Sequence, residues 1–343
     1  MTSMEAGFAA AEGIHRVDAD AEVQVRPLAD GGEGTVEALV AGMNGKTEHV
    51  KVTGPLGEPV ICEYGIIEST KTAVIEMAGA AGITQVPDEK RNPLYTTTYG
   101  VGEVIKDAIE KGCRRFIVGI GGSATNDGGV GMLQALGYAF LDKDGKQVLP
   151  GARGLKDITE ITAAYVIPEL AECKFRVACD VTNPLCGELG CSSIYGPQKG
   201  ATPEMIQDMD QWLGAYAELA KERFPKADPK YPGTGAAGGM GFAFLTFTDA
   251  VLESGINIVL DETKLEDYIK DADLVITGEG RMDGQTAMGK APVGVAKLAK
   301  KYGKKVLAFA GAVQRDARAC NDAGIDAFFP ILRGVVTLEE AMK

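Results

Sequence analysis

Histidine is scarce in this 343-residue sequence, and so is positive charge. The only two histidines, His15 and His49, lie outside the glycine-rich loops, and the chain contains no G-x-S-x-G motif. We therefore expect no serine nucleophile activated by histidine, and we assign any general-base role to a carboxylate. Lys and Arg total 35 against 48 Asp and Glu, a net charge of -13. Without a basic stripe to displace counterions, a nucleic-acid partner is excluded.

Long apolar runs are absent as well. No run reaches the roughly 18 residues of a membrane-spanning helix, so the sequence predicts no membrane partner. No positive charge precedes the first apolar residues, so a signal peptide is not expected. The seven cysteines form no C-x-x-C pair. Their odd number favours reduced thiols in a cytoplasmic protein.

Glycine, in contrast, is abundant, with 45 residues. The glycines follow no fixed period, which excludes collagen-like and low-complexity chains. They cluster at the ends of apolar runs, as is typical of an α/β protein whose loops bind ligands. The length predicts two domains and a large core.

The order of predicted elements indicates how these domains are built. Helix, strand and helix patterns cover residues 4–17, 21–28 and 35–43, and strand-helix alternation returns after about residue 255. Residues 50–78 are β-rich, with Gly-Pro turns and no helix. We predict an α/β fold with a Rossmann-like parallel-sheet domain completed by both chain ends, residues 1–50 and 255–343. A mixed α/β domain, residues 51–254, is inserted into it.

Several predicted strands end in loops rich in glycine and acidic residues, where parallel α/β sheets bind ligands. Glycines let backbone N–H groups approach an anion, and neighbouring carboxylates can hold Mg²⁺. Each loop also has a structural alternative: helix capping, a turn aspartate, an Asx turn, or an Arg281–Asp283 pair. The residues concerned are Asp30 and Glu33; Gly121, Gly122, Ser123, Thr125, Asn126 and Asp127; Asp180 and Asn183; and Glu279, Arg281 and Asp283.

Few cations lie near these loops. Lys199, Arg281 and Lys290 each have a glycine neighbour, which favours a backbone packed close to a ligand over a free helix surface. In a chain of charge -13, they are candidate anchors for a carboxylate or a phosphate, with solvated surface charge as the alternative.

Two nucleotide-binding patterns come close and fail. Gly284–Ala291 resembles a P-loop, but Ala291 has no hydroxyl for Mg²⁺, and we expect the preceding strand to end at Gly278, too far upstream. Gly119–Ala124 fits G-x-G-x-x-A, but polar residues follow where the Rossmann helix should open. We therefore predict neither a P-loop nor a dinucleotide site.

Taken in order, these loops resemble one family, the glycerate kinases of the bacterial type I class. The strings that carry the resemblance run over nearly the whole chain: ADGGEGTVEAL, VTGPLG, IGGSATNDGGVGMLQALG, CDVTNPLCG, YGPQKGA, GAAGGMG and ITGEGRMDGQTAMGKAPVGVA. The resemblance implies transfer of the ATP γ-phosphate, with Mg²⁺, to a hydroxyl of D-glycerate, giving 2-phosphoglycerate. It also implies two α/β domains with the active site between them.

The resemblance indicates which positions form the site, and we assign roles to them as hypotheses. Asp180 and Asp127 bind Mg²⁺ or take the proton of the substrate hydroxyl. Arg281 or Lys199 grips the glycerate carboxylate, and Glu279 and Asp283 orient these groups. The remaining candidates contact phosphate or substrate: Gly121, Gly122, Ser123, Thr125, Asn126, Asn183, Lys290, Asp30 and Glu33.

One departure from the family pattern lies at the N-terminus. Members of the family usually begin with a hydrophobic strand and a PDSFK-type loop, and this sequence starts near the end of that loop. Two alternatives to glycerate phosphorylation therefore stay open: a non-catalytic relative that binds glycerate or nucleotide, and a kinase for another small hydroxy acid.

Overall fold

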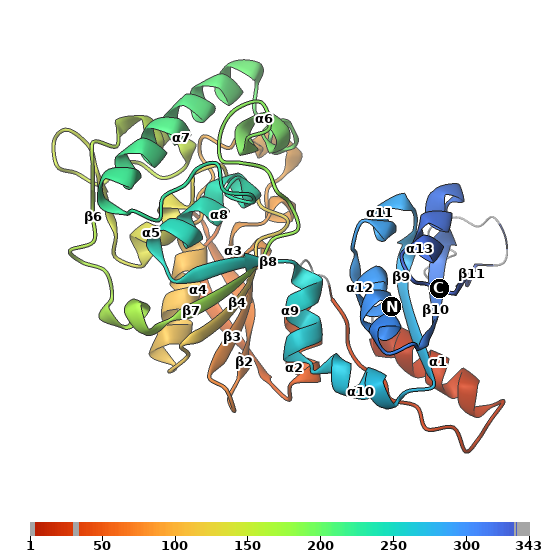
Figure 1. Ribbon diagram of the computed structural model, residues 1–343. Helices are drawn as coiled ribbons and strands as arrows, with labels where there is room; N and C mark the ends of the chain where they lie inside the picture. The colour runs from red at the N-terminus through yellow and green to blue at the C-terminus, as the bar shows by residue number, and fades with distance from the viewer. Residues whose placement is uncertain (1–3, 30–33, 333, 335–343) are drawn as a thin grey trace. The chain divides into compact units, whose positions relative to one another are not determined.

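The computed structural model describes residues 4–29, 34–332 and 334 (Figure 1). Its residues pack into two compact units. Unit 1 contains Met1–Asp30, Ala41–Met43 and Ile256–Lys343, and unit 2 contains Gly31–Val40 and Asn44–Gly255. The domain boundaries expected from the sequence, after residues 50 and 254, remain a prediction.

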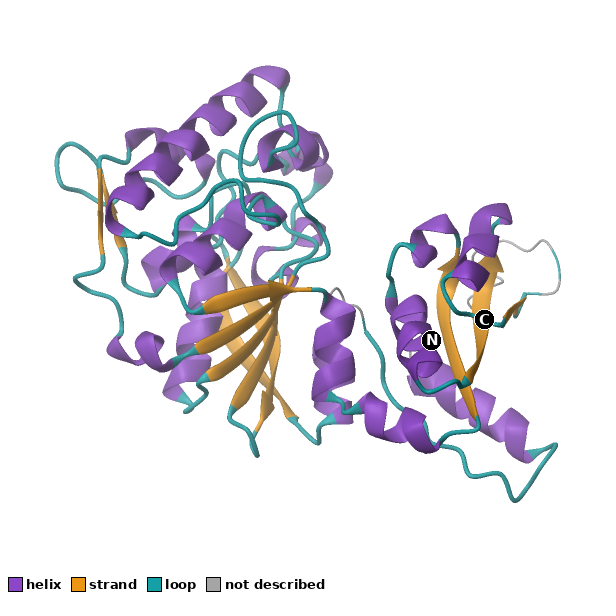
Figure 2. Cartoon of the chain, viewed as in Figure 1, coloured by secondary structure: helices purple, strands orange, loops and turns teal. Residues whose placement is uncertain are grey.

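Both units combine strands and helices, which confirms the predicted α/β class (Figure 2). Unit 2 holds a six-stranded sheet in the order β1-β2-β3-β4-β7-β8. Its first three strands pair antiparallel, and β3, β4, β7 and β8 pair parallel. The strands are β1 Lys46–Thr53, β2 Pro59–Ile67, β3 Thr72–Glu76, β4 Arg115–Gly119, β7 Lys174–Ala178 and β8 Ala250–Glu253, and β5 Ala139–Leu141 pairs with β6 Glu160–Thr162 separately.

Helices pack on both faces of the large sheet in unit 2. On β2, the buried Tyr64 reaches Asp107 of helix α4, whereas the adjacent Gly65 lies against Val36 and Val40 of α2. Alternation along a strand thus sends neighbouring residues to opposite helix layers. The helices are α2 Thr35–Gly42, α3 Ala78–Ala81, α4 Tyr99–Glu110, α5 Val130–Ala135, α6 Cys191–Tyr195, α7 Pro203–Arg223 and α8 Ala236–Phe247, with 3₁₀ turns at Ile83–Gln85, Asp88–Lys90, Ala152–Asp157, Pro168–Glu172 and Pro197–Lys199.

Unit 1 is built on a three-stranded parallel sheet in the order β11-β10-β9. Its core joins Val275 and Met282 of β9 to Val293 and Ala296 of helix α12. The strands are β9 Leu274–Met282, β10 Lys305–Val313 and β11 Ala327–Pro330. The helices are α1 Met4–His15, α9 Gly255–Glu262, α10 Leu265–Asp271, α11 Gly284–Ala287, α12 Ala291–Lys301 and α13 Ala319–Asp322, with a 3₁₀ turn at Arg315–Arg318.

Two sequence-based expectations about strands differ from the structure, and a third concerns residues that the structure does not describe. Residues 21–28 were predicted as a strand, but they form no regular structure. The strand expected to end at Gly278 continues to Met282, so only Asp283 separates it from Gly284. The spacing argument against a P-loop was therefore wrong. The missing hydroxyl at Ala291 still stands, and Gly284–Ala287 forms helix α11 where a P-loop needs an open loop. Asp30 and Glu33 lie outside the described residues.

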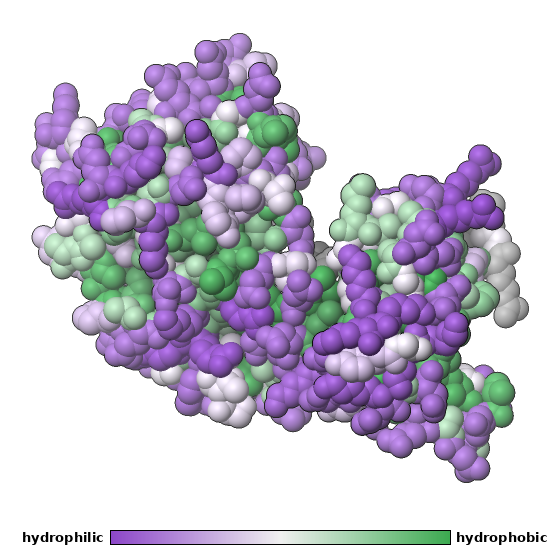
Figure 3. Space-filling view, viewed as in Figure 1, coloured by the Kyte–Doolittle hydropathy of each residue, from purple (hydrophilic) through white to green (hydrophobic). Residues whose placement is uncertain are grey.

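Polar residues cover most of the visible surface of each unit, and exposed apolar residues appear between them (Figure 3). Several large apolar side chains of unit 2 are exposed in its loops, among them Val181 and Leu189 after β7 and Tyr231 between α7 and α8. Within the described chain, no helix combines the length and apolar character that a membrane span requires.

Candidate active-site loops

The four parallel strands of unit 2 end at one edge of the sheet. Glu76 is the last residue of β3, and the segments that follow β4, β7 and β8 contain the Gly121–Ser123 turn, Asp180 and Ser254 respectively. Because parallel α/β sheets bind ligands beyond the carboxyl ends of their strands, this edge is the candidate site of unit 2.

Asp180 is exposed at this edge, two residues after β7. Its Oδ1 accepts hydrogen bonds from the Ser254 hydroxyl at 2.8 Å and from the Gly255 N–H at 3.2 Å. These bonds join the loop after β7 to the two residues that follow β8, and they fix the carboxylate. Among the described residues its second oxygen, Oδ2, has no hydrogen-bond partner. Asp180 thus combines a turn-stabilising contact with an oxygen that is available to a ligand.

The Gly121–Ser123 turn follows β4. Gly121 and Gly122 are exposed, and Gly122 has φ +71°, a left-handed conformation that glycine adopts without strain. The turn is held against the segment after helix α3: the Ile83 N–H donates to the Gly122 carbonyl at 2.8 Å, and the Ala124 N–H donates to Ala81 at 2.9 Å. The exposed backbone here is therefore fixed before any ligand arrives.

The next three residues of this loop are buried. Thr125 and Asn126 are fully buried and Asp127 is 1% exposed. The Asn126 amide donates to the Ser192 hydroxyl at 2.9 Å. Thr125 Oγ1 and Asn126 Oδ1 are buried and find no partner among the described groups. Direct phosphate contact, proposed for Thr125 and Asn126 from the sequence, would require this loop to open.

Asp127 has the surroundings of a structural aspartate. Its carboxylate accepts from the Thr98 N–H and hydroxyl, both at 2.9 Å, and from the N–H groups of Gly129 at 3.1 Å and Gly131 at 3.3 Å. Burial raises its pKa, and these donors oppose the rise. A carboxylate enclosed by four donors has little room for Mg²⁺. The geometry favours the turn aspartate over the metal ligand.

Lys199 is also buried, with 2% exposure. Its ammonium donates to Ser123 Oγ at 2.9 Å and to the Thr125 carbonyl at 2.6 Å. Burial lowers the pKa of Lys199 to about 8. The neighbouring Gly200, at φ +86°, packs against the carbonyl of Arg91. A glycine is needed at this position for backbone packing and not for ligand binding. The buried Lys199 therefore contacts the interior side of the Gly121–Thr125 loop and does not face a ligand.

Two further polar residues complete this edge. The Asn183 amide donates to the Leu189 carbonyl at 2.8 Å and accepts from the Tyr195 hydroxyl at 2.6 Å, so its side chain holds the loop together. Glu76 was not among the predicted site residues. It ends β3, and its Oε1 accepts from the Val36 N–H at 2.9 Å at the start of helix α2. An acid that ends an apolar strand, as in TAVIE, was the signal in the sequence.

Unit 1 carries a second polar cluster, at the carboxyl end of β9. The Thr286 hydroxyl donates to Glu279 at 2.5 Å, and burial raises the pKa of this carboxyl group. Asp283 caps helix α11 through the N–H groups of Gln285 and Thr286. Burial raises the pKa of Asp283 and these hydrogen bonds lower it, and the net shift of the pKa is downward. Asp283 is thus mainly a structural cap.

The cations of this cluster differ from Lys199 in exposure. The side chain of Arg281 is 61% exposed, and its guanidinium lies 3.2 Å from Asp283. Lys290 is half-buried and precedes the first residue of helix α12. The Arg281–Asp283 pair was the structural alternative for these residues, and it is present. It leaves most of the guanidinium in solvent, where an anion could reach it.

The residues present are compatible with a magnesium ion. In the described part of the chain, no three His, Cys, Asp or Glu side chains gather as a metal site. Mg²⁺ commonly binds through one or two carboxylates and keeps several waters or phosphate oxygens. The unpartnered oxygen of the exposed Asp180 fits that requirement, whereas the enclosed Asp127 does not.

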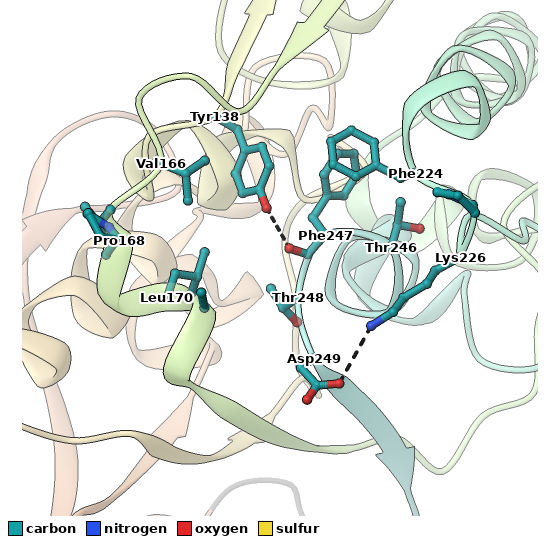
Figure 4. A pocket seen from close by; sticks show the side chains of 13 residues that line it. Tyr138, Val166, Pro168, Leu170, Phe224, Lys226, Thr246, Phe247, Thr248 and Asp249 are labelled. Carbon is teal, nitrogen blue, oxygen red and sulfur yellow. Dashed lines mark hydrogen bonds and ion pairs between the residues drawn. The ribbon is translucent and has the colours of Figure 1, made fainter.

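A cavity of about 440 Å³ lies at the opposite end of the parallel strands in unit 2 (Figure 4). Asp249, just before β8, lines it together with Tyr138, Phe224 and Phe247. The Tyr138 hydroxyl donates to the Phe247 carbonyl at 2.7 Å. None of the predicted site residues lines this cavity, so it is separate from the loops described above.

Fixed glycine turns and carboxylates at the ends of parallel strands are typical of α/β proteins that bind a small ligand. The description "Glycerate kinase family" belongs to a family model that matches residues 1–343. The chain belongs to this family and is a kinase, as the sequence motifs predicted.

Individual relatives extend over the whole chain. A glycerate kinase of Haemophilus influenzae is 50% identical over all of this chain and 91% of its own length. The glycerate 2-kinase of Escherichia coli K12 is 48% identical over all of this chain and 90% of its own length. A crystal structure from Salmonella typhimurium LT2, described as a glycerate kinase 2, has a TM-score of 0.89 at 47% identity, and covers 99% of this chain and 87% of that one.

Proposed function

We propose that this kinase transfers the γ-phosphate of ATP to the 2-hydroxyl of D-glycerate, with Mg²⁺, and so forms 2-phosphoglycerate. The observation that carries the proposal is the 48% identity to a glycerate 2-kinase over the full length of the chain. The exposed Asp180 carboxylate and the fixed Gly121–Ser123 turn support it, because phosphoryl transfer depends mainly on positioning and charge neutralisation.

Asp180 takes the main chemical role in this proposal. Its free Oδ2 would hold Mg²⁺ or accept the proton of the attacking hydroxyl, while Ser254 and Gly255 hold its Oδ1. A bound Mg²⁺ would neutralise phosphate charge. The N–H groups of the Gly121–Ser123 turn would bind an anionic oxygen of a substrate.

In unit 1, we assign anion binding to Arg281. Its guanidinium is exposed and can present two N–H groups to a carboxylate or a phosphate. Glu279 and Asp283 would orient it, since Asp283 pairs with Arg281 and both carboxylates bond to Thr286. Lys290 would give a second anion contact. Asp127 and Asn183 act as loop supports in this account.

The test is ADP release with ATP, Mg²⁺ and D-glycerate, compared with tartronate and lactate at equal concentration. Release that depends on D-glycerate and exceeds release with the other acids supports the proposal. Faster release with tartronate or lactate identifies a kinase for another hydroxy acid. Calorimetric binding of glycerate without turnover identifies a non-catalytic relative.

A further inference from the structure

The buried ammonium of Lys199 faces hydroxyl and carbonyl groups only. It donates hydrogen bonds to the Ser123 hydroxyl and the Thr125 carbonyl. No carboxylate of the described residues forms an ion pair with it. The titratable groups that act on it electrostatically are the thiol of Cys191, whose pKa burial raises to about 11, and the buried carboxyl of Asp127. Burying a positive charge without an ion-pair partner costs free energy, which indicates that this ammonium has a functional role.

The directions of the hydrogen bonds at Ser123 indicate this role. An ammonium only donates, so Ser123 Oγ must accept from Lys199 and keep its own proton for another acceptor. The described residues offer that proton no acceptor. Ser123 is 8% exposed and follows the two exposed glycines of the turn. Its proton is therefore available to a ligand at the carboxyl edge of the sheet.

We propose that Lys199 is a positioning residue that fixes Ser123 as a hydrogen-bond donor to an anionic oxygen of the substrate, either the glycerate carboxylate or a phosphate. Lys199 does not touch this oxygen, and it replaces the direct carboxylate contact expected from the sequence. The inference rests on the proposed function for the identity of the anion but not for the donor arrangement.

The charge state of Lys199 controls the arrangement. A neutral amine can accept a hydrogen bond, so the Ser123 proton can turn inward and leave the substrate without its donor. Since the pKa of Lys199 in the free protein is about 8, kcat/KM should fall on the alkaline side with a midpoint near that value.

The experiment compares Ser123→Ala, which lacks the hydroxyl, with Ser123→Thr, which keeps it. We expect Ser123→Ala to raise one substrate KM roughly 10- to 100-fold, the usual effect of losing a hydrogen bond to a charged group, with a smaller change in kcat. Ser123→Thr should retain the alkaline limb near pH 8, and Ser123→Ala should lose it. A matched control is Ser193→Ala, because the Ser193 hydroxyl only bonds to the Gly187 carbonyl; it should stay within twofold of wild type.

Lys199→Met completes a double-mutant cycle. If Lys199 acts through Ser123, the double variant should resemble Ser123→Ala alone. Independent, multiplying effects would overturn the inference, as would an unchanged pH profile in Ser123→Ala. The second criterion holds even if Lys199→Met does not fold.

Direct binding separates this inference from the proposed function. Calorimetry at pH 7 and pH 9 would measure D-glycerate and inorganic phosphate on wild type and Ser123→Ala. Weaker glycerate binding in the variant assigns the carboxylate, and weaker phosphate binding assigns the phosphate. Equal affinities for both anions in the two proteins contradict the inference, whether or not glycerate is phosphorylated.

Discussion

Replacing Asp180 by asparagine removes one negative charge and changes little else. Oδ1 accepts both hydrogen bonds of the native side chain, at 2.8 and 3.2 Å, and asparagine keeps this oxygen. The amide replaces Oδ2, which has no partner among the described residues. As an exposed substitution that preserves its contacts, Asp180→Asn should change the free energy of unfolding by no more than about 0.5 kcal/mol.

The effect on catalysis should be far larger. If Asp180 holds Mg²⁺ or takes the hydroxyl proton, its loss should lower kcat about 10²- to 10⁴-fold. That range corresponds to about 2.7–5.4 kcal/mol of transition-state stabilisation. The assay is ADP release at saturating ATP and D-glycerate, together with thermal unfolding of the same samples. A large loss of rate without loss of stability is the expected combination.

Asp142→Asn is the matched control for this variant. Asp142 Oδ1 also accepts two hydrogen bonds, from the N–H groups of Asp144 at 2.9 Å and Lys146 at 3.0 Å. It lies in the turn after β5, away from the parallel strand ends, so its variant should keep wild-type kcat. If Asp180→Asn is folded and stays within threefold of wild-type kcat, the role given to Asp180 is refuted.

Three other predictions concern the residues that differ most in burial. Asp127→Asn should lose about 1–3 kcal/mol of unfolding free energy in urea titration, because an amide cannot accept from all four donors around it; unchanged stability would contradict its structural role. Burial lowers the pKa of Lys199 from the ordinary 10.5 to about 8, so between pH 8 and pH 10.5 this lysine is protonated mainly in the unfolded chain. Wild-type stability should therefore rise with pH relative to Lys199→Met over that window, by up to about 3 kcal/mol, and parallel curves would refute the shift. Arg281→Ala should raise a substrate KM by about tenfold while the melting temperature stays constant, because the side chain is 61% exposed; a KM equal to that of wild type would exclude anion binding there.

The sequence predicted the α/β class and the family because both depend on local patterns and long motif strings. The strand-loop pattern also placed Asp180 and the Gly121–Ser123 turn after their strands. Burial was harder to predict. Asp127 and Lys199 look like ligand-binding residues in sequence, but Asp127 meets Thr98 and Lys199 meets Ser123 only through long-range packing.

Strand limits failed for a related reason. Residues 21–28 alternate as a strand would, yet they form no ladder with a neighbouring strand among the described residues. The strand β9 runs through the glycines after Thr277 because β10 pairs with it as far as Met282. In both cases, pairing with a partner strand decided the outcome over the local pattern.

The most direct test of the central claim is the identity of the phosphorylated product. ATP, Mg²⁺ and D-glycerate would be incubated with the protein, and the phosphorus–proton couplings of the product would be read by NMR. We predict a phosphate coupled to the single C2 proton of 2-phosphoglycerate. Coupling to two C3 protons, or ATP consumption that does not depend on glycerate, would contradict it.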